Sequence, residues 1–278
     1  MDEKKINNGW ELDFSFPLGN RTIKPRQSGL TMIIDMGMGP GETRDLLEMG
    51  AGYIDFWKLG FGTSALYDQA FLKQKIGIIN SSGIRIYPGG TFAEIALTQG
   101  KFTSFLVRAR ELGFTTIEIS DGTIFLPPRE RSRAIQTAIR MGFLVLAEVG
   151  KKETGETFRP RSMAEQIGRD LEDGAFKVIL EARESGKNVT IFTEKGEIKK
   201  EQLAELIAQA PSPEQIIWEA PLKTQQIQFI TAFGSNVNLG NIRGRDVLAL
   251  ESLRRGLRSD TFRLSLENKY RGTKGRDD

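Results

Sequence analysis

The sequence predicts a single closed (β/α)8 barrel, the TIM barrel, with short N- and C-terminal extensions. The chain has 278 residues, close to the roughly 250 that this fold uses. Strand-like and helix-like segments alternate along almost its whole length and make eight strand–helix units. An open doubly wound sheet is the alternative, because periodicity does not distinguish closure. Neither a GxGxxG nor a GxxxxGK[ST] phosphate-binding loop is present to favour that open form.

Eight short segments rich in Ile, Val and Leu are predicted to form the strands. Each is apolar almost throughout, as expected of parallel strands that are covered on both faces. In chain order they are residues 31–36, 53–58, 84–88, 115–120, 143–149, 176–181, 215–219 and 235–239.

Amphipathic stretches between these strands are predicted to be helices, and a last one follows the eighth strand. Gly113, Gly142 and Gly174 each come just before the next strand, where a glycine past the C-terminus of a helix is expected. The predicted helices include residues 64–80, 102–112, 129–141, 163–172, 200–210, 224–233 and 245–256.

The chain is expected to form one catalytic domain over residues 30–262, because no linker, repeat or low-complexity stretch divides it. Residues 1–29 are expected to cap the bottom of the barrel or to pack on a neighbour. Residues 263–278 are expected to form a basic, mobile tail. A barrel with such terminal segments is expected to be a homo-oligomer.

Charge and hydropathy favour a cytoplasmic protein that acts on small molecules. The first eight residues are polar with no apolar signal core behind them, and no apolar run approaches the about 20 residues of a membrane span. The 39 basic residues barely outnumber the 36 acidic ones, and acidic residues interrupt the basic C-terminal stretch. We therefore expect neither a membrane nor a nucleic acid as a partner.

The chain contains no cysteine and no histidine, which narrows its chemistry. Disulfides, iron–sulfur clusters, thiolate zinc sites, cysteine nucleophiles, Ser-His-Asp triads and histidine-bound metals are all excluded. Proton transfer must then use Lys, Asp, Glu, Tyr or water. Any metal must be a hard cation bound by oxygen, with Mg²⁺ or Mn²⁺ favoured.

Several predicted strands end in charged residues, at the face where TIM barrels carry their active sites. Glutamates occur on four successive strands, and a buried carboxylate needs a cationic partner. Lys58, Lys152, Arg183 and a bound Mg²⁺ are the available cations. A structural salt-bridge layer is the alternative, but the location of every member at the catalytic end favours a metal and anion site. The candidate metal ligands are Glu118, Glu148, Glu181 and Glu219.

Glycines, a serine and amides near the strand ends are candidate substrate-binding groups. A glycine turn that exposes backbone N–H groups suits phosphate or sulfonate oxygens. In TIM barrels a phosphate often lies near the loops after strands seven and eight. Alternation places residues two apart on the same face of a strand. On these grounds the candidates are Gly89, Gly90, Ser120, Asn236, Asn238 and Asn241.

These motifs resemble the phosphosulfolactate synthase family, in its bacterial branch. Each motif is weak alone, but together they are specific, follow the family order and cover roughly residues 30–262. The matching stretches are Tyr53-Ile54-Asp55-Phe56 with Lys58, Gly60-Phe61-Gly62-Thr63-Ser64, Tyr87-Pro88-Gly89-Gly90-Thr91, Glu118-Ile119-Ser120-Asp121-Gly122, Glu148-Val149-Gly150-Lys151-Lys152, Glu181-Ala182-Arg183-Glu184-Ser185-Gly186, Glu219-Ala220-Pro221, Asn236-Val237-Asn238-Leu239 and residues 253–262.

The resemblance implies a Mg²⁺-dependent enzyme that adds sulfite to phosphoenolpyruvate and gives 2-phospho-3-sulfolactate, a precursor of coenzyme M in methanogens and of sulfolactate in bacteria. Phosphoenolpyruvate and sulfite are then the expected partners, and Mg²⁺ is the expected cofactor. The family's proposed general acid corresponds to Lys152. Lys58 and Arg183 are expected to hold the anionic groups, whereas Lys151 is expected to point to the other face of its strand.

Two stretches depart from the family pattern. Asp35-Met36-Gly37 stands where Asp-Lys-Gly is expected, and the loop over residues 123–128 is more apolar than expected. Two alternatives to the synthase activity therefore stay open. One is a related barrel enzyme for a different phosphorylated enol acid or nucleophile. The other is a non-catalytic heat-stress protein of the same family.

Overall fold

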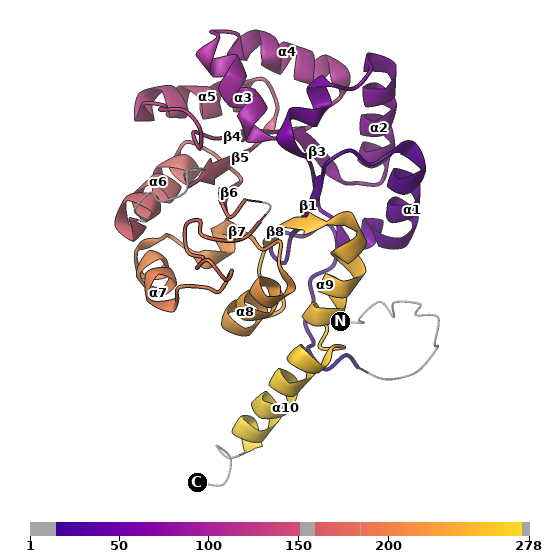
Figure 1. Cartoon of the computed structure of the whole chain (residues 1–278), viewed down its shortest axis with the longest axis vertical. Helices are drawn as coiled ribbons and strands as arrows, with labels where there is room; N and C mark the ends of the chain where they lie inside the picture. The colour runs from indigo at the N-terminus through magenta and orange to yellow at the C-terminus, as the bar shows by residue number, and fades with distance from the viewer. Residues whose placement is uncertain (1–14, 151–158, 184, 274–278) are drawn as a thin grey trace.

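The computed structural model describes residues 15–150, 159–183 and 185–273, with side chains described up to residue 266. Eight parallel strands alternate with helices and surround a common axis (Figure 1). This arrangement confirms the predicted (β/α)8 barrel. The strands are β1 (Thr31–Asp35), β2 (Phe56–Leu59), β3 (Arg85–Pro88), β4 (Thr116–Ile119), β5 (Leu144–Val149), β6 (Lys177–Leu180), β7 (Ile216–Glu219) and β8 (Leu239–Arg243).

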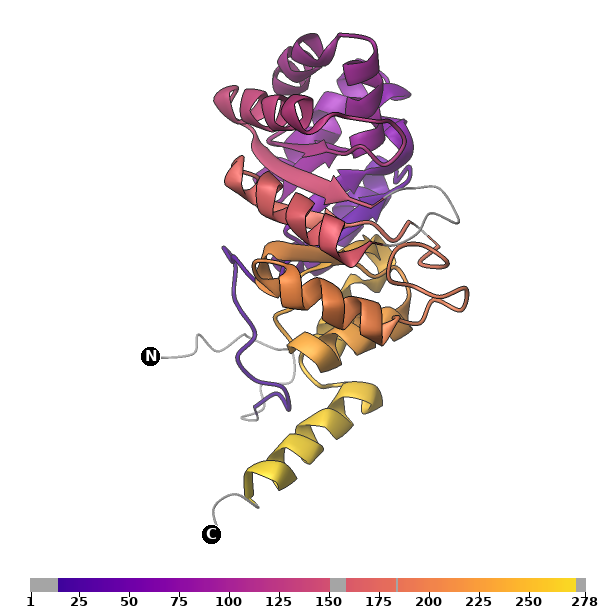
Figure 2. The same ribbon diagram turned by 90° about the vertical axis from the view of Figure 1, so that its left-hand side faces the viewer.

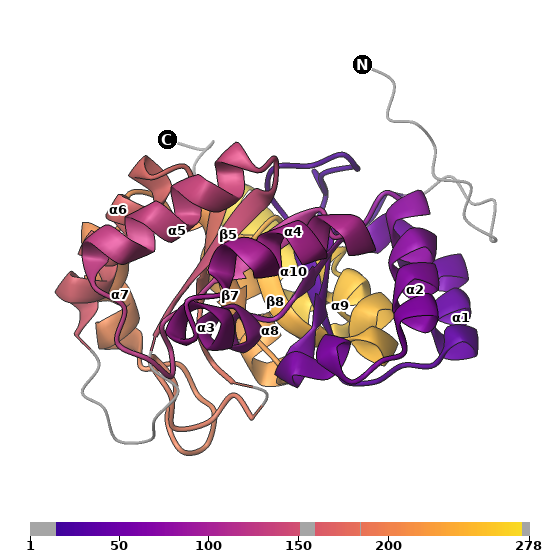
Figure 3. The same cartoon turned by 90° about the horizontal axis from the view of Figure 1, so that it is seen from above.

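Helices cover the outside of the barrel, as the view in Figure 3 shows. Three of them, α1, α3 and α10, lie outside the predicted helical stretches. The α-helices are α1 (Pro40–Gly50), α2 (Gln69–Ser81), α3 (Gly90–Thr98), α4 (Phe102–Leu112), α5 (Pro128–Arg140), α6 (Pro160–Glu172), α7 (Lys200–Gln209), α8 (Lys223–Phe233), α9 (Val247–Arg254) and α10 (Ser259–Thr273). Short 3₁₀ turns are η1 (Ala51–Tyr53), η2 (Gly60–Ala65), η3 (Pro213–Gln215) and η4 (Gly244–Asp246).

The strands follow the order β3-β2-β1-β8-β7-β6-β5-β4, so backbone pairing runs around the barrel from β3 to β4. Every pair in this series is parallel, with Lys58 opposite Tyr87, for example. At the junction of β3 with β4, the backbone N–H of Gly90 donates to Oε1 of Glu118 at 2.6 Å. A side chain at the C-terminal end of the strands thus links the two edges.

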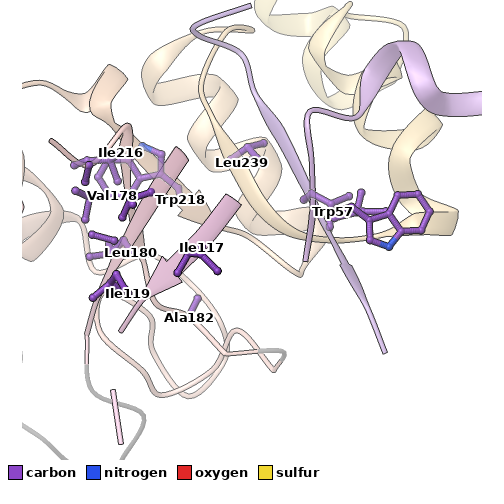
Figure 4. Packing of buried hydrophobic residues seen from close by; sticks show 14 of the residues in the cluster. Trp57, Ile117, Ile119, Val178, Leu180, Ala182, Ile216, Trp218 and Leu239 are labelled. Atoms are coloured by element: carbon purple, nitrogen blue, oxygen red, sulfur yellow. The ribbon is translucent and has the colours of Figure 1, made fainter. Parts of the chain in front are cut away.

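Alternation along the strands divides the apolar core into two layers. Phe56 lies in the barrel interior, whereas Trp57, one residue further on, packs outward against the helices. Figure 4 shows part of the outer layer, where Trp218 lies beside Val178 and Ile216. The inner layer contains Leu30, Met32, Phe56, Tyr87, Leu146, Ile179 and Ile217.

The eighth strand was predicted four residues too early, because β8 begins at Leu239 and not at residue 235. Asn236 and Asn238 therefore lie before β8, at the N-terminal end of the barrel. Asn238 accepts a hydrogen bond from the backbone of Leu30 at 3.0 Å, and Asn236 accepts one from the backbone of Thr22 at 3.1 Å. The expectation that both amides lie at the catalytic end was wrong, since they satisfy backbone groups at the floor.

The described part of the N-terminal extension, residues 15–29, packs on the floor of the barrel. Arg21 pairs with Glu251 at 3.1 Å, and Arg26 pairs with Asp55 at 2.9 Å. The fully buried Arg254 donates to three backbone carbonyls of the floor. Buried charges and amides therefore hold this end of the barrel closed.

The C-terminal helix α10 extends away from the barrel (Figures 1 and 2). Its first turn is tied to α8 by an ion pair between Lys223 and Asp260 at 2.8 Å. The boundary predicted at residue 262 falls inside this helix, so residues 263–273 continue it, and residues 274–278 lie outside the described chain. Within the described residues, no helix has the length and apolar character needed to cross a membrane.

Candidate active site

Lys58, near the end of β2, is surrounded by three glutamates. Its Nζ atom lies 3.0 Å from Oε2 of Glu118, 3.1 Å from Oε2 of Glu148 and 3.5 Å from Oε1 of Glu219. The glutamates come from β4, β5 and β7, and each is only 1% exposed. We call these four residues the Lys58 cluster. The structure thus brings together one predicted cation and three of the predicted acidic residues.

Strand alternation explains where this cluster lies. Lys58 is two residues beyond Phe56, and Glu148 is two residues beyond Leu146, so both follow members of the inner layer. Their side chains therefore point into the barrel as well, in the next layer toward the C-terminal ends of the strands. This is the end at which TIM barrels carry their active sites.

Burial and the contacts within the Lys58 cluster shift the pKa values of its members and of Tyr87. Burial lowers the pKa of Lys58, but the surrounding carboxylates outweigh burial and hold that pKa well above its ordinary value. Burial raises the pKa of Glu219, an effect that Lys58 opposes and Glu148 reinforces. Burial and the charge of Glu118 also raise the pKa of Tyr87 well above its ordinary value. Lys58 is therefore a permanent cation in the site, and Tyr87 stays neutral.

Glu94 of α3 is a further buried carboxylate, and sequence reasoning missed it. The hydroxyl of Ser120 lies 2.5 Å from Oε1 of Glu94 and 2.9 Å from Oε1 of Glu148. The backbone N–H of Thr123 donates to the other oxygen of Glu94 at 3.2 Å. Glu94 follows Gly90 by four residues, which places both on one face of a helix. This spacing is the signal that could have identified it.

Glu181, Arg183 and Asn241 form a second group at the same end of the barrel. The backbone N–H of Arg183 donates to Oε1 of Glu181 at 2.5 Å, and its carbonyl accepts from Asn241 at 3.4 Å. Arg183 has a φ of 58°, a conformation that is uncommon for residues other than glycine. Its guanidinium forms no hydrogen bond or ion pair with any residue that the structure describes. Its backbone is thus fixed, while its charge remains available for an anion.

Asn241 occupies an irregularity in β8. Thr31 of β1 pairs with Leu239, but Ile33 pairs with Ile242, so β8 contains one extra residue here. Such a bulge re-aims a side chain, and Asn241 has the left-handed φ of 53°. Its Oδ1 atom is buried and has no hydrogen-bond partner within the described chain. Asn241 therefore lies near the mouth, as predicted, with one oxygen free to bind a ligand.

Arg131 of α5 supports the cluster from behind. It donates to both carboxylate oxygens of Asp170 at 2.8 and 2.7 Å, to Asp121 at 3.0 Å and to the backbone carbonyl of Glu148 at 2.8 Å. Burial lowers the pKa of Arg131, but its hydrogen bonds and its attraction to Asp170 outweigh burial and raise it. This guanidinium fixes the end of β5. The sequence pattern, which shows it only as a helical residue, did not reveal this role.

Gly89 and Gly90 do not form the expected anion cradle. The N–H of Gly89 donates to the carbonyl of Leu59 at 3.0 Å, and the N–H of Gly90 donates to Glu118. Both donors are used within the protein, so the prediction that they face a ligand was wrong. The glycine at position 90 is needed for packing, because an added Cβ would lie 2.6 Å from Oε1 of Glu118.

The predicted general acid Lys152 lies outside the described residues, as does Lys151.

The structure describes residues 35–37, where the sequence departs from the family pattern. Asp35 is fully buried and accepts hydrogen bonds from Trp57 at 2.8 Å and from the backbone of Gly37 at 2.8 Å. Met36 beside it is 50% exposed. Asp35 thus holds the end of β1, and the residue that differs from the family pattern faces outward.

The four predicted glutamate ligands do not meet at one metal position. Three of them converge on Lys58, and no group of three or more acidic side chains in the described chain is placed to hold a metal. The donor set nevertheless suits a hard cation, because it offers only oxygens. Mg²⁺ is often bound by one or two carboxylates, with substrate oxygens and water completing its shell. Glu181 and Oδ1 of Asn241 are the described groups that fit this role.

A parallel barrel with an apolar interior and a dense set of buried charges at its C-terminal mouth is an enzyme of the TIM-barrel class. Residues 19–260 match the family model of (2R)-phospho-3-sulfolactate synthase, ComA. The chain belongs to this family.

Individual relatives agree with the family match. The chain is 44% identical to the phosphosulfolactate synthase of Methanothermobacter thermautotrophicus over 251 residues, which is 90% of this chain and 97% of the relative. It is 40% identical to that of Bacillus subtilis over 252 residues, 90% of this chain and 98% of the relative. The YdjI aldolase of Escherichia coli K12 shares the fold alone, with a TM-score of 0.52 and 12% identity over 87% of this chain and 90% of that chain. The chain is an enzyme of the phosphosulfolactate synthase type.

Proposed function

We propose that the chain catalyses the Mg²⁺-dependent addition of sulfite to phosphoenolpyruvate, giving 2-phospho-3-sulfolactate. Membership of the family supports this reaction. The observation that carries the proposal is the Lys58 cluster, a set of buried charges at the catalytic end of the barrel. Well-packed apolar side chains of similar volume would give the barrel about the same stability, so the presence of this charged cluster favours a functional role.

The reaction needs anion binding, stabilisation of negative charge and one proton. The lone pair on the sulfite sulfur attacks the methylene carbon of phosphoenolpyruvate and forms the C–S bond. The electron pair of the C=C bond then moves onto the neighbouring carbon and its carboxylate, as an enediolate. One proton adds to that carbon, and the phosphate ester bond stays intact. Atoms and charge therefore balance with the uptake of a single proton.

The described residues divide these tasks. The three N–H groups of Lys58 face three glutamates, so Lys58 would hold the cluster together and leave anion binding to other cations. Arg183, whose guanidinium is available, would bind the phosphate, carboxylate or sulfite. We assign the proton to Lys152 on the resemblance to the family. This lysine follows β5, whose Glu148 belongs to the cluster.

Mg²⁺ would be held by Glu181, with Asn241 as a second protein oxygen. When bound, it would stabilise the negative charge that develops on the substrate carboxylate. The other carboxylates keep their described partners in this proposal. Glu118, Glu148 and Glu219 remain on Lys58, and Glu94 remains on Ser120.

A related enzyme that acts on a different phosphorylated enol acid or nucleophile is the second candidate. It is favoured by two exposed apolar residues at the mouth, Met36 at 50% and Phe125 at 84% exposure. A non-catalytic stress protein is the third. The thermal midpoint with and without Mg²⁺ and phosphoenolpyruvate distinguishes this third reading, because a ligand that binds only the folded state raises the midpoint.

The deciding experiment follows the phosphorus signal of phosphoenolpyruvate by ³¹P NMR in the presence of sulfite, Mg²⁺ and the protein. We expect a new phosphate ester that needs all of these components. Lys152→Ala should abolish it, whereas the matched control Lys151→Ala should not. Unchanged phosphoenolpyruvate with folded, Mg²⁺-supplied protein would show that the proposed reaction is incorrect.

We also propose that the protein works in the cytoplasm and assembles as a homo-oligomer. The absence of a membrane-spanning helix among the described residues is compatible with this location. Light scattering coupled to size-exclusion chromatography measures the mass of the assembly. A mass equal to that of one chain would contradict the oligomer.

A further inference from the structure

A cavity lies on the outer side of α3, away from the Lys58 cluster. It has a volume of about 360 Å³ and is lined by residues of η2, α2, α3 and α4. Leu72, Phe92, Phe105 and Leu112 make its interior apolar. Small-molecule sites in proteins typically have about 300–1,000 Å³ and a mostly apolar lining. The cavity is therefore large enough for a small organic molecule.

The helix α3 separates this cavity from the Lys58 cluster. Its residues Phe92 and Ala96 line the cavity, whereas Gly90 and Glu94 contact Glu118 and Ser120. Figures 1 and 3 show α3 beside α4, which supplies the opposite wall. The cavity thus shares no lining residue with the Lys58 cluster, and its proposed ligand does not depend on the reaction proposed above.

Ser64 provides a polar group inside the apolar chamber. Its side chain lines the cavity and is only 4% exposed. Its Oγ atom has no hydrogen-bond partner among the described residues. A buried hydroxyl without a partner is unfavourable, so this atom favours a ligand with a second polar atom.

The rim of the cavity carries positive charge. Lys101 and Arg108 line it and are both exposed. Arg108 is already occupied, because it pairs with Glu111 at 2.8 Å and with Gln69 at 2.7 Å. The ammonium group of Lys101, in contrast, forms no ion pair or side-chain hydrogen bond within the described chain. An anionic group at the rim would complement this charge.

We propose that this cavity binds a small organic acid with an apolar body. The carboxylate lies at Lys101, the body packs on the rings of Phe92 and Phe105, and a polar inner end reaches Ser64. The two rings already pack edge to face, with centroids 5.3 Å apart, and form a firm apolar wall. The ligand class follows from an apolar chamber, an unsatisfied inner hydroxyl and a cationic rim.

The test uses octanoate, 8-hydroxyoctanoate and octylammonium as probes of the full chain, with saturation-transfer NMR and the thermal midpoint as readouts. Octanoate should bind and raise the midpoint, since it binds the folded state only. The hydroxylated acid should bind about two- to tenfold more tightly, and Ser64→Ala should remove this gain. Octylammonium should not bind, because its charge repels that of Lys101.

Two matched pairs of surface variants locate the site. Ser104→Trp blocks the rim, whereas Thr103→Trp places the same bulk on an exposed neighbour outside the lining. Lys101→Glu reverses the rim charge, whereas Lys73→Glu makes the same change on an exposed lysine of α2. Only the first member of each pair should weaken octanoate binding. Absent octanoate binding to the folded protein, or binding that persists in Ser104→Trp, overturns the proposal.

Discussion

The Nζ atom of Lys58 and the Oε2 atom of Glu148 lie 3.1 Å apart inside the barrel, although 90 positions separate them in the sequence. The pair joins β2 to β5, two strands that are not neighbours in the sheet. Because Glu118 and Glu219 share the same ammonium, the mouth behaves as one charged unit. A substitution of one member should therefore change the electrostatic environment of the others.

Lys58→Met should destabilise the protein by about 3–5 kcal/mol, because it leaves buried carboxylates without their cation. Methionine keeps much of the length of the side chain, so lost packing contributes little. Urea unfolding measures the free energy. Lys73→Met, on the exposed face of α2, should change it by less than about 0.5 kcal/mol. Equal unfolding midpoints for Lys58→Met and the unmodified protein would contradict the coupling of these charges.

Glu219→Gln should gain stability relative to the unmodified protein as the pH rises. Burial raises the pKa of Glu219 in the folded state above its unfolded value, so the folded protein binds that proton more tightly. The stability that this proton contributes is complete below the unfolded pKa and is lost as the pH rises through the folded pKa. Glutamine does not titrate and avoids this loss.

Urea unfolding between about pH 5 and pH 8 measures this difference for Glu219→Gln. Glu201→Gln, an exposed substitution in α7, serves as the control and should show a nearly constant difference. A difference for Glu219→Gln that stays constant, or that moves against the variant as the pH rises, would show that the pKa of Glu219 is not raised in the folded protein.

The first seven strands lie within three residues of their predicted bounds, because continuous apolar runs mark them clearly. The eighth was misplaced for a physical reason. Asn236-Val237-Asn238-Leu239 alternates like a strand, but its amides satisfy the floor of the barrel. The true β8 carries the polar Asn241 in a bulge, and sequence periodicity contains no information about such an inserted residue.

Site residues that lie on strands were predicted from the sequence, whereas the contributions of the helical residues Glu94 and Arg131 were missed. Alternation was enough to place Glu118 and Glu148 inside the barrel, but their convergence on Lys58 depends on the three-dimensional closure of the sheet. Glu94 belongs to a helix whose start, Gly89-Gly90, reads as a turn. The use of these glycine donors within the protein likewise depends on contacts between distant segments.

Gly90→Ala should be destabilising by about 1–3 kcal/mol and should lower activity, because the new methyl group overpacks the site. Its Cβ would lie 2.6 Å from Oε1 of Glu118 and 2.6 Å from Cβ of Ser120. Gly89→Ala is the matched control, since its Cβ would meet its nearest atom, the Leu59 carbonyl oxygen, at 3.3 Å. Thermal midpoints and initial rates measure both variants. Equal effects of the two substitutions would show that contact with Glu118 is not the cause.

Arg183→Gly should weaken substrate binding strongly but change the stability of the fold only slightly. Glycine adopts the φ of 58° without strain but also gives the unfolded chain more freedom. These effects oppose each other, so the free energy of unfolding should change by less than about 1 kcal/mol. The loss of the guanidinium should raise the KM for phosphoenolpyruvate by about tenfold or more, because a charge-assisted contact to an anion contributes about 1.5–3 kcal/mol.

The control for this variant is Asn188→Gly, because Asn188 also has a left-handed φ, 51°, but is exposed and lies outside the charged groups of the mouth. Its stability should change by a similar amount, while its KM should stay at the unmodified value. Steady-state rates over a range of phosphoenolpyruvate concentrations, together with urea unfolding, test both statements. If Arg183→Gly keeps the unmodified KM, the strained backbone at position 183 serves the fold of the loop, and the anion is bound elsewhere.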